Sequence, residues 1–202
     1  MHLLESFILT FIPVFVATDA IGNIPLFVGL TEGLDQRERN RVANMSVLMA
    51  TAITLLFMLF GRLVFSIMSI SVPDFRIAGG ILLLVLSTHM LIAGKTTREV
   101  GGDVAVFPLA SPLIAGPAVL TTTLVLTGTR GLGMTLVSLV LNMAITWVVF
   151  RQCHRIEMLI TRQGSKAFSK VVEILLAAIA VSMIRKGLEA IIRGTQGKGF
   201  AG

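Results

Sequence analysis

Six apolar segments, each long enough to cross a bilayer, constrain this chain more than any other feature of its sequence. A helix needs roughly 20 mainly apolar residues to span the hydrocarbon core. The segments that qualify are Leu3–Leu30, Val42–Phe65, Asp74–Gly94, Val104–Thr127, Met134–Cys153 and Val171–Ile192. Only 14% of the residues are charged, against about 25% in an ordinary soluble domain. The sequence therefore predicts an all-α integral membrane protein with six transmembrane segments, in one domain over residues 1–193, and a disordered tail over 194–202.

Basic residues exceed acidic residues by 17 to 11, which gives a formal net charge of +6. They lie between the apolar segments or at their ends, where Lys and Arg set the orientation of a membrane protein, so the excess does not indicate nucleic acid binding. Ten of the 17 fall in the loops after the first, third and fifth segments. This bias predicts that those loops are cytoplasmic and that both termini lie outside.

The first segment contains Asp19, Gly22, Asn23 and Pro25 near its middle. Gly and Pro are poor helix formers, and Pro also lacks an N–H and clashes with the preceding turn. A charge in hydrocarbon is costly, so an ionisable residue there is a functional-site hypothesis by default. We therefore predict a broken helix that faces a small polar cavity.

The fourth segment contains Pro108, Pro112 and Pro117, which cannot all lie in one continuous helix. Ser111–Pro112 and Gly116–Pro117 each resemble a helix start, with a capping residue followed by Pro. An offset of 93 residues (110 − 17) aligns this break with the first, and the same offset aligns the halves 3–94 and 104–192 without a gap. Chance matches are common in apolar sequence, but one offset serves three consecutive segments. Because each half has three spans, the prediction is an inverted repeat.

Paired broken helices in an inverted repeat predict a substrate site near the middle of the membrane. A half-helix N-terminus suits a carboxylate, and a glycine at each break lets a ligand approach the backbone. Asp19 could pair with a substrate ammonium or carry a proton; the alternative is a cap that only satisfies backbone N–H groups. The predicted substrate-binding residues are Asp19, Gly22, Asn23, Ser111, Ala115, Gly116 and Thr122, the predicted helix-break residues are Pro25, Pro112 and Pro117, and no catalytic or metal-ligating residue is predicted.

Other polar residues in the segments have ordinary structural interpretations. Glu173 lies close to Lys170 and is interpreted as a surface pair, with a proton-carrying carboxylate as the alternative. His89 is interpreted as a hydrogen-bonded structural residue, with a proton relay as the alternative. Asn142 and Thr146, one helical turn apart, are expected to make interhelical hydrogen bonds.

Three motifs, Asp19–Phe27, Ile77–Leu82 and Pro108–Pro117, resemble the MarC family of bacterial inner-membrane proteins, which includes the SnatA-type transporters of small neutral amino acids. The resemblance covers residues 3–193. It implies six spans in the bacterial inner membrane, and transport of glycine, alanine or similar amino acids coupled to an ion gradient. With the orientation above, both termini would be periplasmic. The family's usual Asp-Pro is Asp19-Ala20 here, and Glu173 stands where Gly is usual.

These observations predict a secondary transporter of small neutral amino acids that works by alternating access, with H+ or Na+ as the coupling ion and no cofactor. An exporter or channel for another small metabolite or drug is the alternative within transport. An intramembrane enzyme is disfavoured because the chain lacks HExxH and GxSxG motifs. A membrane scaffold would not need matched broken helices. The expected partners are the amino acid and the lipid bilayer, without nucleic acid, and a homo-oligomer is left open.

Overall fold

The computed structural model describes residues 2–93, 105–153 and 162–198, and over these ranges the chain is helical and contains no strand. The predicted all-α class is therefore confirmed. The elements in chain order are α1 (His2–Thr18), α2 (Ile24–Leu30), α3 (Gln36–Met68), α4 (Val72–Ala93), the π-helix η1 (Ala105–Ile114), α5 (Pro117–Arg130), α6 (Leu132–Gln152) and α8 (Arg162–Lys198).

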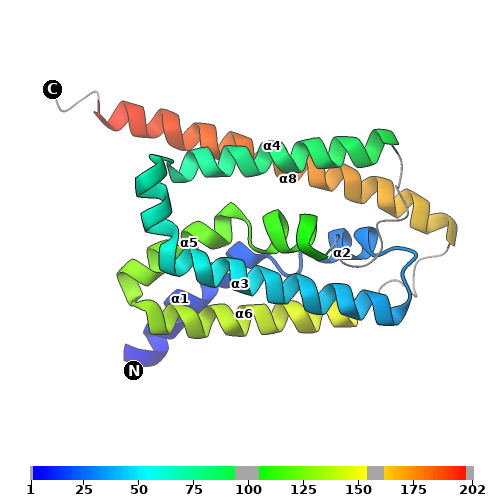
Figure 1. The fold of residues 1–202 in the computed structure, drawn as a ribbon, viewed down its shortest axis with the longest axis horizontal. Coiled ribbons are helices and arrows are strands. Elements are labelled where there is room, and N and C mark those ends of the chain that lie inside the picture. Colours follow the sequence, from blue (N-terminus) through cyan, green and yellow to red (C-terminus); the bar gives the residue numbers. More distant parts are fainter. Residues whose placement is uncertain (1, 94–104, 154–161, 199–202) are drawn as a thin grey trace.

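Each predicted segment corresponds to one helix or to two helices in succession. The first segment is divided between α1 and α2, and the fourth between η1 and α5. The helices run back and forth along the long axis, and the start of α1 and the end of α8 lie at the same end (Figure 1). Helix α8 continues to Lys198, past the start of the expected tail.

Within the described residues, length and composition identify some but not all of the six predicted spans. Helix α3, residues Val72–His89 of α4, and α6 are each long and apolar enough to cross a membrane. The pair η1 and α5, bent by 54°, makes a fourth if the pair is one span. Helix α1 contributes only the shorter apolar stretch Leu4–Thr18, because the chain breaks after Thr18. Three or four candidate spans are therefore found in the described residues, and six spans remain a prediction.

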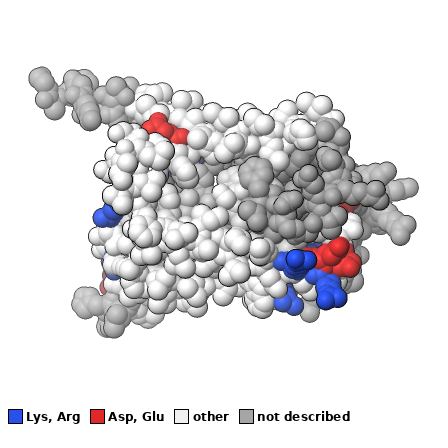
Figure 2. Space-filling view, viewed as in Figure 1, with Lys and Arg blue, Asp and Glu red and all other residues white. Residues whose placement is uncertain are grey.

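The surface of the helical bundle has the character of a protein surrounded by lipid. Large apolar side chains such as Leu56, Leu63 and Val137 are half or more exposed. Figure 2 shows the charged side chains of the described residues toward the two ends of the long axis, with uncharged surface between them. Soluble monomers rarely expose so many large apolar side chains on one continuous surface. A bilayer would cover this surface, in agreement with the predicted membrane protein.

Helices α4 and α8 lie side by side and run in opposite directions (Figure 1). Glycines allow their backbones to approach closely. A Cβ built on Gly80 would lie 2.9 Å from the Ala180 carbonyl oxygen, and one on Gly187 would lie 3.0 Å from the Pro73 carbonyl oxygen. Small residues at such contacts are typical of helix packing in membranes.

The remaining helices form a second group of contacts. Helix α1 packs on α6, η1 packs on α3, and α3 packs on α6. The Asn142 side chain donates to the carbonyls of Ser138 (2.8 Å) and of Phe11 on α1 (3.4 Å), which confirms its interhelical role. Thr146 instead donates to Asn142 O in its own helix, at 2.9 Å. The rings of Phe27 on α2 and Phe150 on α6 stack with centroids 4.4 Å apart.

We expect Gly80→Ala to lower the free energy of unfolding by about 1–3 kcal/mol, because the added methyl group would overpack the contact with α8. Unfolding of the purified protein in mixed micelles, followed by circular dichroism, measures this change. Gly133→Ala is the matched control, since nothing lies within 4 Å of a Cβ built on Gly133. Equal stability of the two variants would contradict the role assigned to Gly80.

Candidate functional site

The first helix break is a tight turn that joins α1 to α2. Its first residue, Asp19, has φ 45°, in the left-handed region that Asp tolerates better than most residues. The Asp19 carboxylate accepts a hydrogen bond from Gly22 N at 3.0 Å. A Cβ on Gly22 would overlap this carboxylate, so only glycine leaves room for the interaction. Asp19 therefore caps the turn through one oxygen, and its side chain is otherwise exposed.

Asn23 connects the two halves of the broken helix. Its side chain is buried and donates from Nδ2 to the carbonyl of Thr18, the last residue of α1, at 3.0 Å. The last carbonyls of a helix lack partners within the helix, and this bond satisfies one of them. Pro25 follows in the first turn of α2. The break predicted at these residues is thus confirmed, and Asn23 has a structural role in it.

The second helix break lies between η1 and α5. Gly116 is the N-cap residue, with an extended backbone, and Pro117 begins α5, as predicted. The expectation that Ser111–Pro112 also starts a helix is wrong, because both residues lie inside η1. The π-helical ladder ends with Ala115 N donating to Ala110 O at 2.8 Å. A π-helix pairs residues five apart, and Pro112, which has no N–H, donates no bond to this ladder.

A cavity of about 500 Å³ lies at the two breaks and receives residues from both. Asp19 and Asn23 of the first break and Gly116 of the second line it, together with Pro112 and Pro117. The complete lining, which also includes parts of α4 and α8, consists of Val16, Ala17, Thr18, Asp19, Asn23, Arg76, Leu83, Pro112, Leu113, Gly116, Pro117, Ala118, Ile179, Ser182, Met183 and Lys186. The structure therefore brings together residues that are about 90 positions apart in the sequence.

The other predicted site residues do not line this cavity. Gly22 is exposed beside Asp19, and Ser111, Ala115, Thr122 and Pro25 are absent from the lining. Thr122 lies beyond the first turn of α5, which is the part of α5 that lines the cavity.

One further polar residue from the sequence analysis also lies apart from this cavity, and a second cannot be placed. His89 is exposed on α4 and does not line it. The side chain of Glu173 lies outside the described residues.

Sequence reasoning missed three polar residues of the cavity: Arg76 on α4, and Ser182 and Lys186 on α8. Arg76 and Lys186 entered the sequence analysis only as basic residues that set the orientation in the membrane. A helical pattern connects them with neighbours that line the same cavity, since Arg76 and Leu83 are seven residues apart on α4, as are Ile179 and Lys186 on α8. That pattern could have marked one face of each helix, but only the packing of α4 on α8 shows that the two faces meet.

The cavity carries charges of both signs. Asp19 is acidic, and Arg76 and Lys186 are basic, so the formal charge is +1. Within the described residues, neither basic side chain has a hydrogen bond or an ion pair. Arg185, the neighbour of Lys186, pairs instead with Glu189 at 3.0 Å on the exposed side of α8. The described part of the chain thus supplies no partner to the two cavity cations or to the second oxygen of Asp19.

The N-terminus of α5 adds partial positive charge to the same cavity. Gly116 and Ala118 line it, and the free N–H groups of a first helical turn attract anions. Gly79 lets α4 approach this turn, because a Cβ there would lie 3.1 Å from Pro117 Cγ. Arg76 precedes Gly79 by one helical turn.

In the described part of the chain, no group of three His, Cys, Asp or Glu side chains could hold a metal ion.

Comparison with known proteins adds an independent observation. The family model described as "MarC family integral membrane protein" matches residues 4–192. The chain is 32% identical to the UPF0056 membrane protein MJ1677 of Methanocaldococcus jannaschii, over 94% of this chain and 98% of the relative. It is 30% identical to the UPF0056 membrane protein YvbG of Bacillus subtilis, over 92% of this chain and 96% of the relative. These names state no substrate, and no solved structure matches the chain.

We expect Asp19→Ala to lower the free energy of unfolding by about 1 kcal/mol, because it removes the acceptor of the Gly22 N–H. Asp19→Asn should stay close to the unmodified protein, since an amide oxygen can accept the same bond and Asn also tolerates a left-handed backbone. Unfolding in mixed micelles measures both changes. If Asp19→Asn lowers the free energy of unfolding as much as Asp19→Ala does, the negative charge of Asp19 contributes to stability. The hydrogen bond from Gly22 N alone would then not explain the role of Asp19.

Proposed function

The chain belongs to the MarC family of integral membrane proteins, and on that premise we propose that it is a secondary transporter of small neutral amino acids such as glycine and alanine. The observation that carries the proposal is the cavity at the two helix breaks. It presents one carboxylate, Asp19, and two cations, Arg76 and Lys186. An amino acid zwitterion carries the complementary pair of charges.

The cavity suggests a position for each end of the substrate. The substrate ammonium group pairs with the Asp19 carboxylate, one oxygen of which already accepts a hydrogen bond from Gly22 N. The substrate carboxylate pairs with Arg76, because a guanidinium can bind both oxygens at once. Lys186 and the first turn of α5 add positive charge beside it. The small residues Ala17, Gly116 and Ala118 line the cavity and leave room for the substrate beside them.

Two observations support an inverted repeat as the basis of alternating access. The helices that follow the breaks begin at Ile24 and Pro117, which differ by the predicted offset of 93 (117 − 24). In the repeat, α1, α2, α3 and α4 correspond to η1, α5, α6 and α8. The contact of α1 with α6 therefore corresponds to that of η1 with α3, and the contact of α2 with α8 corresponds to that of α5 with α4. All four contacts occur. Inverted repeats alternate access by rocking one part against the other around a fixed site.

Coupling to an ion gradient would run through Asp19. It is the only acidic residue of the cavity, and its counterpart at the offset of 93 is Pro112 (112 − 19). We propose H+ or Na+ as the coupling ion, with no cofactor and no enzymatic step. We propose a bacterial inner-membrane location, and the Lys and Arg distribution supports an orientation with both termini in the periplasm.

A second candidate is an exporter or channel for another small metabolite. The formal charge of +1 in the cavity specifically favours a small carboxylate anion that has no ammonium group. This candidate shares the cavity and the cations but does not need Asp19 as an ammonium partner.

Flux into liposomes tests the proposed function. Purified protein should transport labelled glycine or alanine when a proton or sodium gradient is imposed. Asp19→Asn should lose the gradient dependence while it keeps its fold. Flux of lactate but of no neutral amino acid would favour the second candidate, and the absence of neutral amino acid flux under every gradient would refute the substrate assignment.

We expect Arg76→Gln to raise the KM for glycine by about tenfold or more, because it removes a charge-assisted hydrogen bond to the substrate carboxylate. Transport of glycinamide, which has no carboxylate, should change little. Arg185→Gln is the matched control, since Arg185 does not line the cavity and pairs with Glu189 on the exposed side of α8. An unchanged KM in Arg76→Gln would remove Arg76 from the substrate site.

A further inference from the structure

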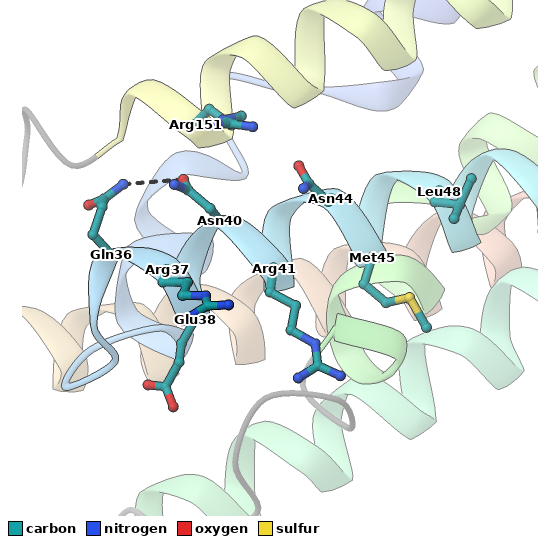
Figure 3. Close-up of a pocket in the computed structure, with 9 residues that line it drawn as sticks. All are labelled: Gln36, Arg37, Glu38, Asn40, Arg41, Asn44, Met45, Leu48 and Arg151. Atoms are coloured by element: carbon teal, nitrogen blue, oxygen red, sulfur yellow. Dashed lines mark hydrogen bonds between the residues drawn. The ribbon is translucent and has the colours of Figure 1, made fainter.

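A groove of about 960 Å³ lies on the surface of the bundle, apart from the cavity at the breaks (Figure 3). It is lined by the first turns of α3, from Gln36 to Leu48, and by Arg151 near the end of α6. None of its lining residues lines the cavity at the breaks. Its chemistry therefore calls for a separate explanation.

The groove is basic. Three arginines (Arg37, Arg41 and Arg151) and one glutamate (Glu38) line it, for a formal charge of +2. Glu38 is already engaged, because its carboxylate accepts from Asp35 N at 3.3 Å in the capping box of α3. In Figure 3, Arg37 and Arg41 project from one side of α3, and Arg151 lies on α6 across from the other side.

Part of the groove is held rigidly between two helices. Trp147 Nε1 on α6 donates to Asn44 Oδ1 on α3 at 2.7 Å. The guanidinium of Arg151 lies 5.1 Å from the centre of the Trp147 ring, within the range of a cation–π interaction. Asn44 thus positions Trp147, and Trp147 positions Arg151.

The groove also passes from polar to apolar along α3. Its charged residues are confined to the first turns, up to Arg41, whereas Met45 and the 63%-exposed Leu48 follow one and two turns later. Leu48 belongs to the exposed apolar surface of α3, and Trp is enriched at membrane–water interfaces. The boundary between headgroups and acyl chains therefore crosses the groove.

We propose that this groove binds a phospholipid with an anionic headgroup. Arg41 and Arg151 attract the phosphate from opposite sides, Asn40 and Asn44 lie between them as hydrogen bond donors, and an acyl chain follows Met45 and Leu48. A zwitterionic lipid carries the same phosphate but adds a cation that the excess positive charge repels. Basic pockets between helices at this depth are typical sites for anionic headgroups. The proposal does not depend on the transported substrate.

The only tryptophan of the chain, Trp147, provides a local probe. The full-length protein is reconstituted into phosphatidylcholine vesicles that contain phosphatidylglycerol, and either lipid is supplied with brominated acyl chains. Bromine quenches Trp fluorescence on contact, so the two quenching curves yield the relative affinity of the lipids next to Trp147. We expect phosphatidylglycerol to be preferred by about fivefold for each engaged arginine at low salt, and less at high salt.

Variants identify the groove as the origin of the preference. Arg41→Gln/Arg151→Gln should bring the relative affinity close to one, whereas Arg41→Lys/Arg151→Lys should keep most of it, because the charges remain. Arg130→Gln, at the exposed end of α5 and outside the groove, should behave as the unmodified protein. Inorganic phosphate should not abolish the preference.

Several outcomes would overturn the proposal. The first is equal quenching by both lipids in the unmodified protein. The second is an equal loss of preference in the Lys and Gln double variants, which would assign the effect to altered packing. The third is displacement by inorganic phosphate, which would make the groove a site for the free ion.

Discussion

Every backbone polar group within a membrane needs a partner, and the two helix breaks depend on how this chain meets that constraint. At the first break the partners are side chains, since Asp19 accepts from Gly22 N and Asn23 donates to the Thr18 carbonyl. At the second break they belong to the backbone, through a π-helical ladder that ends at Ala115 N. The breaks thus satisfy part of their polar groups locally, whereas the start of α5 at Gly116 has no side-chain cap, and the polar cavity lies beside it.

The charges of this cavity are held by helices that do not themselves break. Close packing at Gly80 and Gly187 fixes α4 against α8, and Gly79 allows α4 to approach the start of α5. This packing places Arg76 and Lys186 at the same cavity as Asp19. Charges of both signs therefore meet at one cavity although they come from three different parts of the chain.

The cavity and the groove along α3 use charge in different ways. The cavity has charges of both signs, which suits a ligand with two opposite charges. The groove has a larger positive excess and continues into exposed apolar surface, which suits a long ligand with a charged end. The two features lie on different helices and share no lining residue.

Much of the architecture follows from the sequence alone. The apolar segments, the break at Asp19–Pro25 and the helix start at Gly116–Pro117 all follow from local chemistry, because Gly, Pro and charge act on the residues next to them. The same local rules failed at Ser111–Pro112, which lies inside a π-helix, a form that the residue pattern did not distinguish from a helix start. Only the tertiary structure decided that Arg76 and Lys186 join Asp19, and that Trp147 and Asn44 align Arg151. Those contacts depend on which faces of distant helices meet, and packing determines this, whereas the periodicity of a single helix does not.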